Sequence, residues 1–267
     1  MKNKIFGFIG IGLFLVIGSL AHEFWIAPSS YIVKSNTPFT INCYAGEDFK
    51  QALWANRKVR TLGVYHFYQN NKVDITNAFV EQDLLAVPMI LPTSGNHLIA
   101  FRSKPSYIEM EGTAFNGYLK EDGIADVLNY RIQNKLSNIR SREFYQRCAK
   151  TLLQADGISD STFGIDTGMP LEIIPLENPY KLQTDKLAVY FEYKGKPLSN
   201  YQVRTWCINN GKLIVKSFHK TNEKGVVILP VKESGEWMFS VVKMEVLKDH
   251  SKADYESFWG SFTFYKK

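Results

Sequence analysis

Strand periodicity is clearest in Leu187-Ala188-Val189-Tyr190-Phe191-Glu192-Tyr193, where a large apolar residue occupies every second position. This alternation is typical of a β-strand with one buried face. The turn signal Lys194-Gly195-Lys196-Pro197 follows, and further short alternating runs extend to the aromatic segment from Phe258 to Tyr265. About seven strands within roughly ninety residues is typical of an immunoglobulin-like fold. We therefore expect residues 171–267 to form a C-terminal immunoglobulin-like β-sandwich.

The N-terminal half shows the same period of two. Phe39, Ile41 and Cys43 alternate with their neighbours, and Asn70-Asn71 is placed as a tight hairpin turn. Residues 22–112 therefore predict a first antiparallel β-sandwich. The expected fold class is mainly β: two antiparallel β-sandwich domains with a helical hairpin inserted between them.

The predicted hairpin, residues 113–157, has a helical period. Asp122 is placed to cap a helix whose apolar residues recur every four positions, at Ile124, Leu128, Ile132 and Leu136. A second helix is expected to open at Ser141 and to end before Gly157, with one apolar stripe made by Phe144, Cys148 and Leu152. Residues 158–170 are rich in Gly, Ser, Asp and Pro and predict a linker.

The charged residues of this segment are expected to form a solvated face, as charged helical residues usually do. They are Arg131, Lys135, Arg140, Arg142, Glu143, Arg147 and Lys150.

The composition is that of a globular protein. The 267 residues are 45% hydrophobic and 22% charged, which excludes a disordered, collagen-like or coiled-coil chain. The basic residues behind the net charge of +6 are scattered among acidic ones, so no nucleic-acid partner is expected.

Residues 1–21 have the features of a signal peptide. Lys2 and Lys4 precede an apolar run from Ile5 to Ile17, and Ser19-Leu20-Ala21 offers small residues for cleavage. The run is shorter than the ~20 residues of a membrane span, which disfavours the alternative of an uncleaved anchor. Cleavage would leave a periplasmic protein that is not embedded in the membrane.

Three cysteines, Cys43, Cys148 and Cys207, are an odd number, so at least one thiol is free. We expect three buried, unreactive thiols. One disulfide is the alternative, and Cys43 with Cys207 is then the favoured pair because both lie in strand-like segments.

Cleavage before His22 would create a metal-binding terminus. A terminal histidine offers its α-amine and an imidazole nitrogen to one ion, and the amine pKa near 8 allows a metal to displace its proton at neutral pH. Cu²⁺, Ni²⁺ and Co²⁺ suit such nitrogen ligands. We expect His97 or His66 to complete the site, with oxygen ligands available from Glu23, Glu47 and Asp48.

Simpler interpretations stay open for these residues. His22 would then only follow a cleavage site, with Phe24 and Trp25 as packing anchors, and His66 and His97 would be ordinary core or surface histidines. His219 and His250 are expected to be solvated.

No organic cofactor and no enzyme activity is expected, since the sequence has neither a Gly-x-Ser-x-Gly turn nor a His-Glu-x-x-His helix. Oxidative copper chemistry is a minor alternative. A non-catalytic carbohydrate- or protein-binding module is the main one, with aromatic rings that could stack on sugars. These are Trp54, Tyr65, Tyr68, Trp206 and Trp237.

Several stretches together are similar to one bacterial periplasmic family. They are His22-Glu23-Phe24-Trp25-Ile26-Ala27-Pro28, residues 115–123, residues 142–150, residues 170–180, Gly195-Lys196-Pro197-Leu198 and residues 254–264. The family is known as a domain of unknown function, and some members are described as periplasmic components of nickel or cobalt transport. The resemblance implies an exported two-sandwich protein that handles a transition metal, with an outer-membrane receptor or an inner-membrane permease as partner.

Two departures from the family pattern weaken a histidine-rich metal site. Relatives often have a histidine before the methionine that here is Met244, where this chain has Lys243. They also often have a histidine after the glycine–acid pair that here is Gly46-Glu47, where this chain has Asp48.

Overall fold

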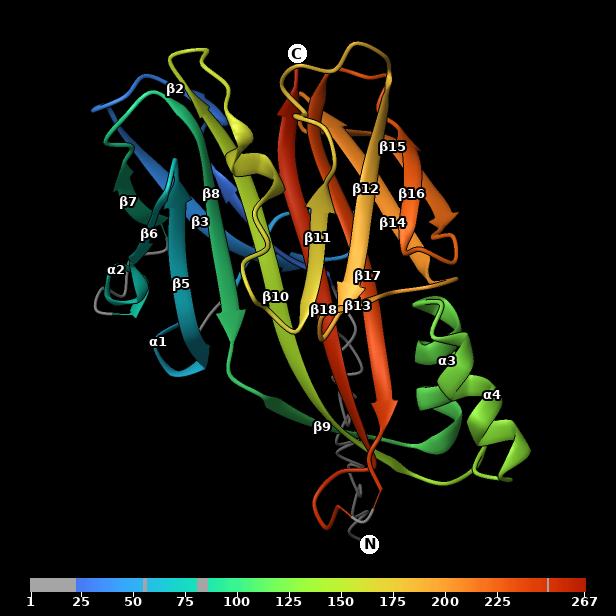
Figure 1. Cartoon of the computed structure of the whole chain (residues 1–267). Coiled ribbons are helices and arrows are strands. Elements are labelled where there is room, and N and C mark those ends of the chain that lie inside the picture. Colours follow the sequence, from blue (N-terminus) through green and yellow to red (C-terminus); the bar gives the residue numbers. More distant parts are fainter. Residues whose placement is uncertain (1–22, 55–56, 81–85, 249) are drawn as a thin grey trace, which may run out of the picture.

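The computed structural model describes residues 23–54, 57–80, 86–248 and 250–267. The predicted signal peptide and His22 lie outside the described residues. Within them the chain is mainly β, as Figure 1 shows, with sheets packed face to face and one helical hairpin. The fold class expected from the sequence is therefore confirmed.

The largest element is a ten-stranded sheet, here called the long sheet, which contains strands from both halves of the chain. Its main path is β15 (Lys212–Lys220), β14 (Gln202–Asn209), β17 (Gly235–Val246), β18 (Tyr255–Lys266), β10 (Ser141–Ala155), β8 (Gly95–Ser103), β5 (Thr61–Tyr68) and β6 (Asn71–Asp74). Two short strands also pair with β10, namely β2 (Ile32–Val33) and β9 (Ser106–Met110).

The two halves of the chain meet at β10 and β18. These strands pair in parallel, with Glu143 opposite Tyr255 at one end and Thr151 opposite Thr263 at the other. On its other edge β10 pairs antiparallel with β8. The halves therefore share one continuous sheet.

Two four-stranded sheets cover opposite faces of the long sheet. The first small sheet contains β1 (Glu23–Pro28), β3 (Pro38–Gly46), β4 (Ala52–Leu53) and β7 (Ala86–Ile90). The second small sheet contains β11 (Leu171–Pro175), β12 (Lys186–Tyr193), β13 (Lys196–Pro197) and β16 (Val226–Pro230).

Alternation along β8 and β10 shows that the two small sheets lie on different faces. Leu98 and Leu152 belong to the core under the second small sheet. Their neighbours Ile99 and Leu153 belong to the core under the first small sheet. Because successive side chains of a strand point to opposite faces, each small sheet packs on its own side of β8 and β10.

The C-terminal half has the strand order of an immunoglobulin fold. The second small sheet runs β11-β12-β16, and the long sheet contributes β15-β14-β17-β18. In chain order these correspond to strands A-B-E facing C′-C-F-G, the arrangement that defines the immunoglobulin sandwich.

The helical hairpin differs from the expected one, because its helices are α3 (Gly112–Glu121) and α4 (Ala125–Gln133), and only α4 corresponds to an expected helix. Both pack near the free end of β17. Their buried residues Phe115, Leu119 and Val127 contact Met244 and Trp259. The other helical segments are short: α1 (Arg57–Arg60), α2 (Thr76–Val80) and the 3-10 turn η1 (Ser161–Gly164). Asp122 was expected to cap the start of a helix. In the structure it instead follows the last residue of α3.

The predicted helix from Ser141 is wrong, because Ser141–Ala155 is strand β10. The apolar stripe of Phe144, Cys148 and Leu152 has a spacing of four. That spacing is also a multiple of two, so it places the same side chains on one face of a strand. The strand occupies the middle of the long sheet and is buried on both faces from Gln146 onward.

The predicted solvated face is wrong for four of its seven charged residues. The exposed fraction is 1% for Arg131, 2% for Glu143, 7% for Arg147 and 1% for Lys150. Each is buried because the strand or helix that carries it packs against the rest of the fold.

Lys150 forms the most deeply buried ion pair of the described residues. Its Nζ lies 2.5 Å from Oε2 of Glu172, and both side chains are at most 1% exposed. The other carboxylate oxygen of Glu172 accepts hydrogen bonds from the backbone N–H groups of Thr167 and Met169. The pair therefore ties β10 to the segment that leads into β11.

We predict that Lys150→Met lowers the free energy of unfolding by about 3–5 kcal/mol, because it leaves the carboxylate of Glu172 buried without its cation. The double variant Lys150→Met/Glu172→Gln should recover part of this loss. Urea denaturation at pH 7 measures both. A single variant within 1 kcal/mol of the unmodified protein would contradict the role of the pair.

Candidate functional site

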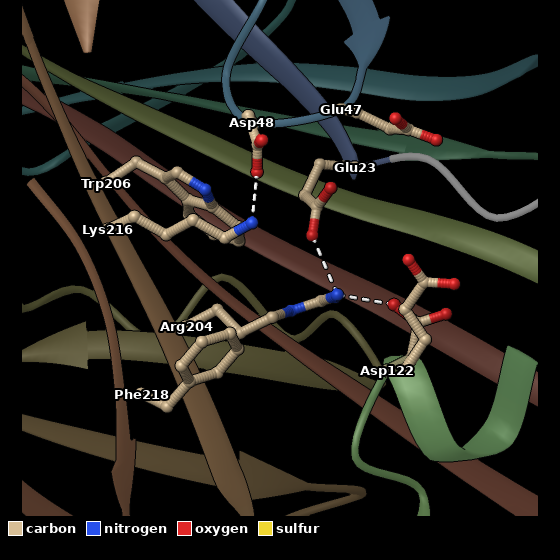
Figure 2. A pocket seen from close by; sticks show the side chains of 9 residues that line it. Glu23, Glu47, Asp48, Asp122, Arg204, Trp206, Lys216 and Phe218 are labelled. Atoms are coloured by element: carbon tan, nitrogen blue, oxygen red, sulfur yellow. Dashed lines mark hydrogen bonds and ion pairs between the residues drawn. The ribbon is translucent and has the colours of Figure 1, made fainter.

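An acidic pocket lies where the first strand, the helical hairpin and the C-terminal sandwich meet. The cavity has a volume of about 150 Å³. It is lined by five acidic residues, two basic residues and two aromatic ones, shown in Figure 2: Glu23, Glu47, Asp48, Glu121, Asp122, Arg204, Lys216, Trp206 and Phe218. We call this cavity the acidic pocket.

Arg204 is the central residue of the acidic pocket. Its Nη1 lies 2.9 Å from Oε1 of Glu23 and also donates a short hydrogen bond to Oδ1 of Asp122 (Figure 2). The three residues come from β14, β1 and the end of α3. Their side chains are at most 8% exposed. One guanidinium therefore holds together three segments that are distant in sequence.

Burial raises the pKa of Asp122 to about 7, even though the guanidinium of Arg204 opposes the shift. The nearby carboxylate of Glu23 also raises it. The charge of the acidic pocket therefore changes near neutral pH.

A second buried carboxyl, Glu143, interacts electrostatically with Asp122 of the pocket. Its Oε1 accepts hydrogen bonds from the hydroxyls of Tyr118, at 3.1 Å, and Ser257. Burial raises the pKa of Glu143 to about 7, and the two hydroxyls only partly offset this. Asp122 also raises the pKa of Glu143 by charge repulsion, so the two carboxyls are coupled.

The turn after β3 supplies the remaining acidic residues. Asp48 and Phe49 both have left-handed backbone angles, with φ of 52° and 59°. The ring of Phe49 is fully buried against Trp25, which anchors the turn. Asp48 Oδ1 lies 2.5 Å from Nζ of Lys216, and this hydrogen bond lowers the pKa of Asp48.

His66 and His97 are brought together, but in another part of the fold. Nε2 of His66 lies 2.8 Å from Nδ1 of His97, and Nε2 of His97 lies 2.9 Å from the carbonyl oxygen of Thr93. Because a carbonyl only accepts, His97 must donate from Nε2 and accept at Nδ1. Both nitrogens of His97 are thus engaged, and neither offers a lone pair to a metal in this arrangement.

Burial lowers the pKa of both histidines, that of His66 to about 3, so they are neutral. Neither lines the acidic pocket. His97 is opposite Leu153 on β10, whereas Arg147, six residues earlier on β10, lies over the ring of Phe24. Six strand residues span about 20 Å, so His97 is far from the start of β1. That either histidine completes a site with His22 remains a prediction, since His22 lies outside the described residues.

The cysteines and tryptophans are core residues. Cys43, Cys148 and Cys207 are free and buried, as expected, and burial raises the pKa of the latter two thiols to about 12. The exposed fractions of Trp54, Trp206 and Trp237 are 9%, 2% and 1%, too low for these rings to stack on a sugar at the surface.

Among the described residues, no group of three or more His, Cys, Asp or Glu side chains is arranged to hold a metal ion. No helix in this part of the chain is long and apolar enough to cross a membrane.

Fold and pocket together define a mainly β protein with an immunoglobulin-like C-terminal half and an acidic pocket at the start of its first strand. The chain belongs to the family described as "Domain of unknown function (DUF4198)", whose model matches residues 19–245. No curated protein matches the sequence significantly.

Three solved structures are similar to the chain at low sequence identity. The D0-D1 domain of intimin is 12% identical with a TM-score of 0.23, and the match covers 90% of this chain and 97% of that one. The human OSCAR ligand-binding domain is 9% identical with a TM-score of 0.20, covering 90% and 97%. Three N-terminal domains of the bacteriophage RB49 Hoc protein are 10% identical with a TM-score of 0.19, covering 91% and 59%. At these TM-scores the matches carry no argument about fold or function.

Sequence reasoning identified part of the acidic pocket and missed its centre. Glu23, Glu47 and Asp48 were expected as oxygen ligands, and all three line it. Asp122 was expected only as a helix cap. Arg204 had no distinguishing signal, because a single arginine in a strand resembles any solvated surface residue.

We predict that Glu143→Gln reduces the pH dependence of stability between pH 5 and 8. The folded-state pKa is raised from 4.5 to about 7, so this carboxyl stabilises the fold in its protonated form, and stability falls as pH rises through about 7. In the variant, the decrease in the free energy of unfolding between pH 5 and 8 should be smaller by about 3 kcal/mol. The reason is that the pKa of Glu143 differs by two to three units between the folded and unfolded states.

Urea denaturation at pH 5 and pH 8 measures the difference. The exposed residue Glu177 provides the control variant Glu177→Gln, which should behave like the unmodified protein. An unchanged pH dependence in Glu143→Gln would show that Glu143 is not the titrating group.

Proposed function

We propose that this protein is an exported, periplasmic transition-metal-binding accessory protein that supports nickel, cobalt or copper uptake or homeostasis. In this proposal the metal binds at the processed N-terminus, beside the acidic pocket. The observation that carries the proposal is the charge of that pocket: five carboxyl groups and only two basic side chains line it. One of the five is Glu23, which would be the second residue after the predicted cleavage.

The pocket chemistry fits a cation. A cavity with an excess of carboxyl groups and partly apolar walls attracts positive ligands, since low-dielectric surroundings strengthen the field of the charges. Divalent first-row metals accept mixed nitrogen and oxygen ligand sets. His22 would supply the α-amine and the imidazole nitrogen, and Glu47 and Asp48 would supply carboxylate oxygens.

Chain connectivity supports a shared site for these groups. His22 is bonded to Glu23, and consecutive Cα atoms are 3.8 Å apart. Glu23 pairs with Gly46 across β1 and β3, directly before Glu47 and Asp48. Asp48, the position at which the family resemblance implies a histidine in relatives, lies in the acidic pocket.

A bound metal would change the protonation state of Asp122, the partner of Arg204. A cation near the pocket favours the ionised form of Asp122, whose pKa lies near 7, so binding should release a proton. Handover of the ion to an outer-membrane receptor or an inner-membrane permease completes the proposed role. No catalytic step is assigned to the protein.

We predict that one additional residue before His22 weakens Ni²⁺ and Cu²⁺ binding at least tenfold, because it separates the α-amine from the imidazole. Mass spectrometry of the exported protein first establishes its N-terminus, and isothermal titration calorimetry then compares the affinities. Equal affinities for the two forms would exclude His22 as the chelating residue.

Two variants separate the possible ligand sets. Glu47→Gln/Asp48→Asn should weaken binding if the acidic pocket supplies oxygen ligands, whereas His66→Gln should leave it unchanged. Loss of binding in His66→Gln alone would instead favour the histidine ligand set expected from the sequence. His219→Gln is the matched control for removing a histidine elsewhere.

A further inference from the structure

A second cavity, of about 220 Å³, lies on the face of the long sheet that is opposite the acidic pocket. Its floor is formed by β5 and β8, where Tyr65 and Ala100 are directly paired. Both residues pack with the core under the second small sheet. Trp206 of the acidic pocket points the other way, because its strand neighbour Cys207 belongs to that core. We call this second cavity the cationic cavity.

The charged side chains that line the cationic cavity are Lys72 and Arg102, and no carboxylate lines it. Within the described ranges neither forms an ion pair with a carboxylate. Nζ of Lys72 lies 4.5 Å from the ring centre of Tyr65. Arg102 donates from Nε and Nη2 to the neutral side-chain oxygen of Gln146, at 3.3 and 3.0 Å.

Asp74 lies close to Lys72, since it is two residues further along β6 and pairs with Tyr65. The hydrogen bonds of Thr76 and, to a smaller extent, the charge of Lys72 lower the pKa of Asp74. An adjoining open cavity that shares Arg102 contains the acidic groups Asp166, Glu192 and Glu256, and Lys194 lies among them. Glu256 is linked to Arg102 only through Gln146, whose amide donates to Glu256 Oε1 at 3.3 Å. The guanidinium of Arg102 therefore keeps donor capacity toward the cationic cavity, since it has five N–H groups.

The wall opposite the sheet is held by hydrogen bonds to a buried carboxylate. Thr167, Gly168 and Met169 form this wall, in the segment that crosses the front of the long sheet before β11 (Figure 1). The backbone N–H groups of Thr167 and Met169 both donate to Glu172, which the buried Lys150 neutralises. The wall is thus anchored to a buried ion pair.

The cavity also has apolar surface. Leu62, Tyr65, Ala100 and Met169 give the cavity apolar walls beside its two cations. Such a site suits a ligand with one anionic end and an apolar body, because few convergent polar groups among apolar walls are typical of small-molecule pockets. A free phosphate would leave the apolar walls unused.

We propose that the cationic cavity binds a small organic carboxylate, with the carboxylate between Lys72 and Arg102 and the apolar body against Tyr65 and Met169. This site is independent of the proposed metal site. It lies on the other face of the long sheet, shares no residue with the acidic pocket and needs no processed terminus.

Benzoate is the probe, and benzamide is its neutral match in size and shape. Calorimetry should show saturable benzoate binding and at least tenfold weaker benzamide binding, because a charge-assisted hydrogen bond is roughly twice as strong as a neutral one. Amide NMR signals of Gly63 and Gly168 should shift with benzoate. Inorganic phosphate should compete weakly or not at all.

Lys72→Gln and Arg102→Gln should each weaken benzoate binding about tenfold, and Arg102→Lys should retain more affinity than Arg102→Gln. The exposed Lys186 lies on β12, a strand that lines neither cavity. It provides the control Lys186→Gln, which should bind benzoate normally. Circular dichroism verifies that each variant is folded.

Four results would overturn the proposal. The first three are no saturable benzoate binding, equal binding of benzamide, and unchanged affinity in folded Lys72→Gln and Arg102→Gln variants. Phosphate binding that is tighter than benzoate binding would also overturn it, since the cavity would then be a site for inorganic anions.

Discussion

The parallel pairing of β10 with β18 is the constraint on which the rest of the structure depends. The partners Glu143 and Tyr255 are more than one hundred residues apart, so their pairing closes a long loop and carries a large entropic cost. That cost is offset by cores on both faces of β10. Leu152 packs under the second small sheet and Leu153 under the first. Both small sheets thus support one strand, and the two halves of the chain stabilise each other.

The acidic pocket is a direct consequence of this shared sheet. Glu23, Asp122 and Arg204 come from an N-terminal strand, the helical hairpin and the immunoglobulin-like half. They meet because β1 and the hairpin both lie on the same face of the long sheet, where the odd-numbered side chains of β18 point. Thr263 donates to the carbonyl oxygen of Ile26 and fixes β1 there, and Trp259 contacts the helices. The pocket therefore exists only in the joined fold, which distinguishes it from a site carried by one sandwich.

Sequence periodicity predicts strands that have one buried and one wet face, and it fails where both faces are buried. The alternation at Leu187 and Val189 predicted β12 correctly, because its other face is partly exposed. In β10 every residue from Gln146 to Ala155 is buried, so alternation disappears. The remaining signal was a spacing of four, which a helix and a strand share. Topology was equally hidden, because no local pattern indicates that β10 pairs with a strand at the end of the chain.

The same topology explains why the buried charges could not be recognised in the sequence. Lys150 and Glu172 neutralise each other across two segments, and Arg204 neutralises carboxyls from two others. A charged residue is tolerated inside a protein when such a partner is present, and the partner is set by the fold and not by neighbours in sequence. The result is an electrostatic division. The long sheet separates an acidic pocket on one face from a cationic cavity on the other. The ligands proposed for the two cavities would therefore reach the protein from opposite faces.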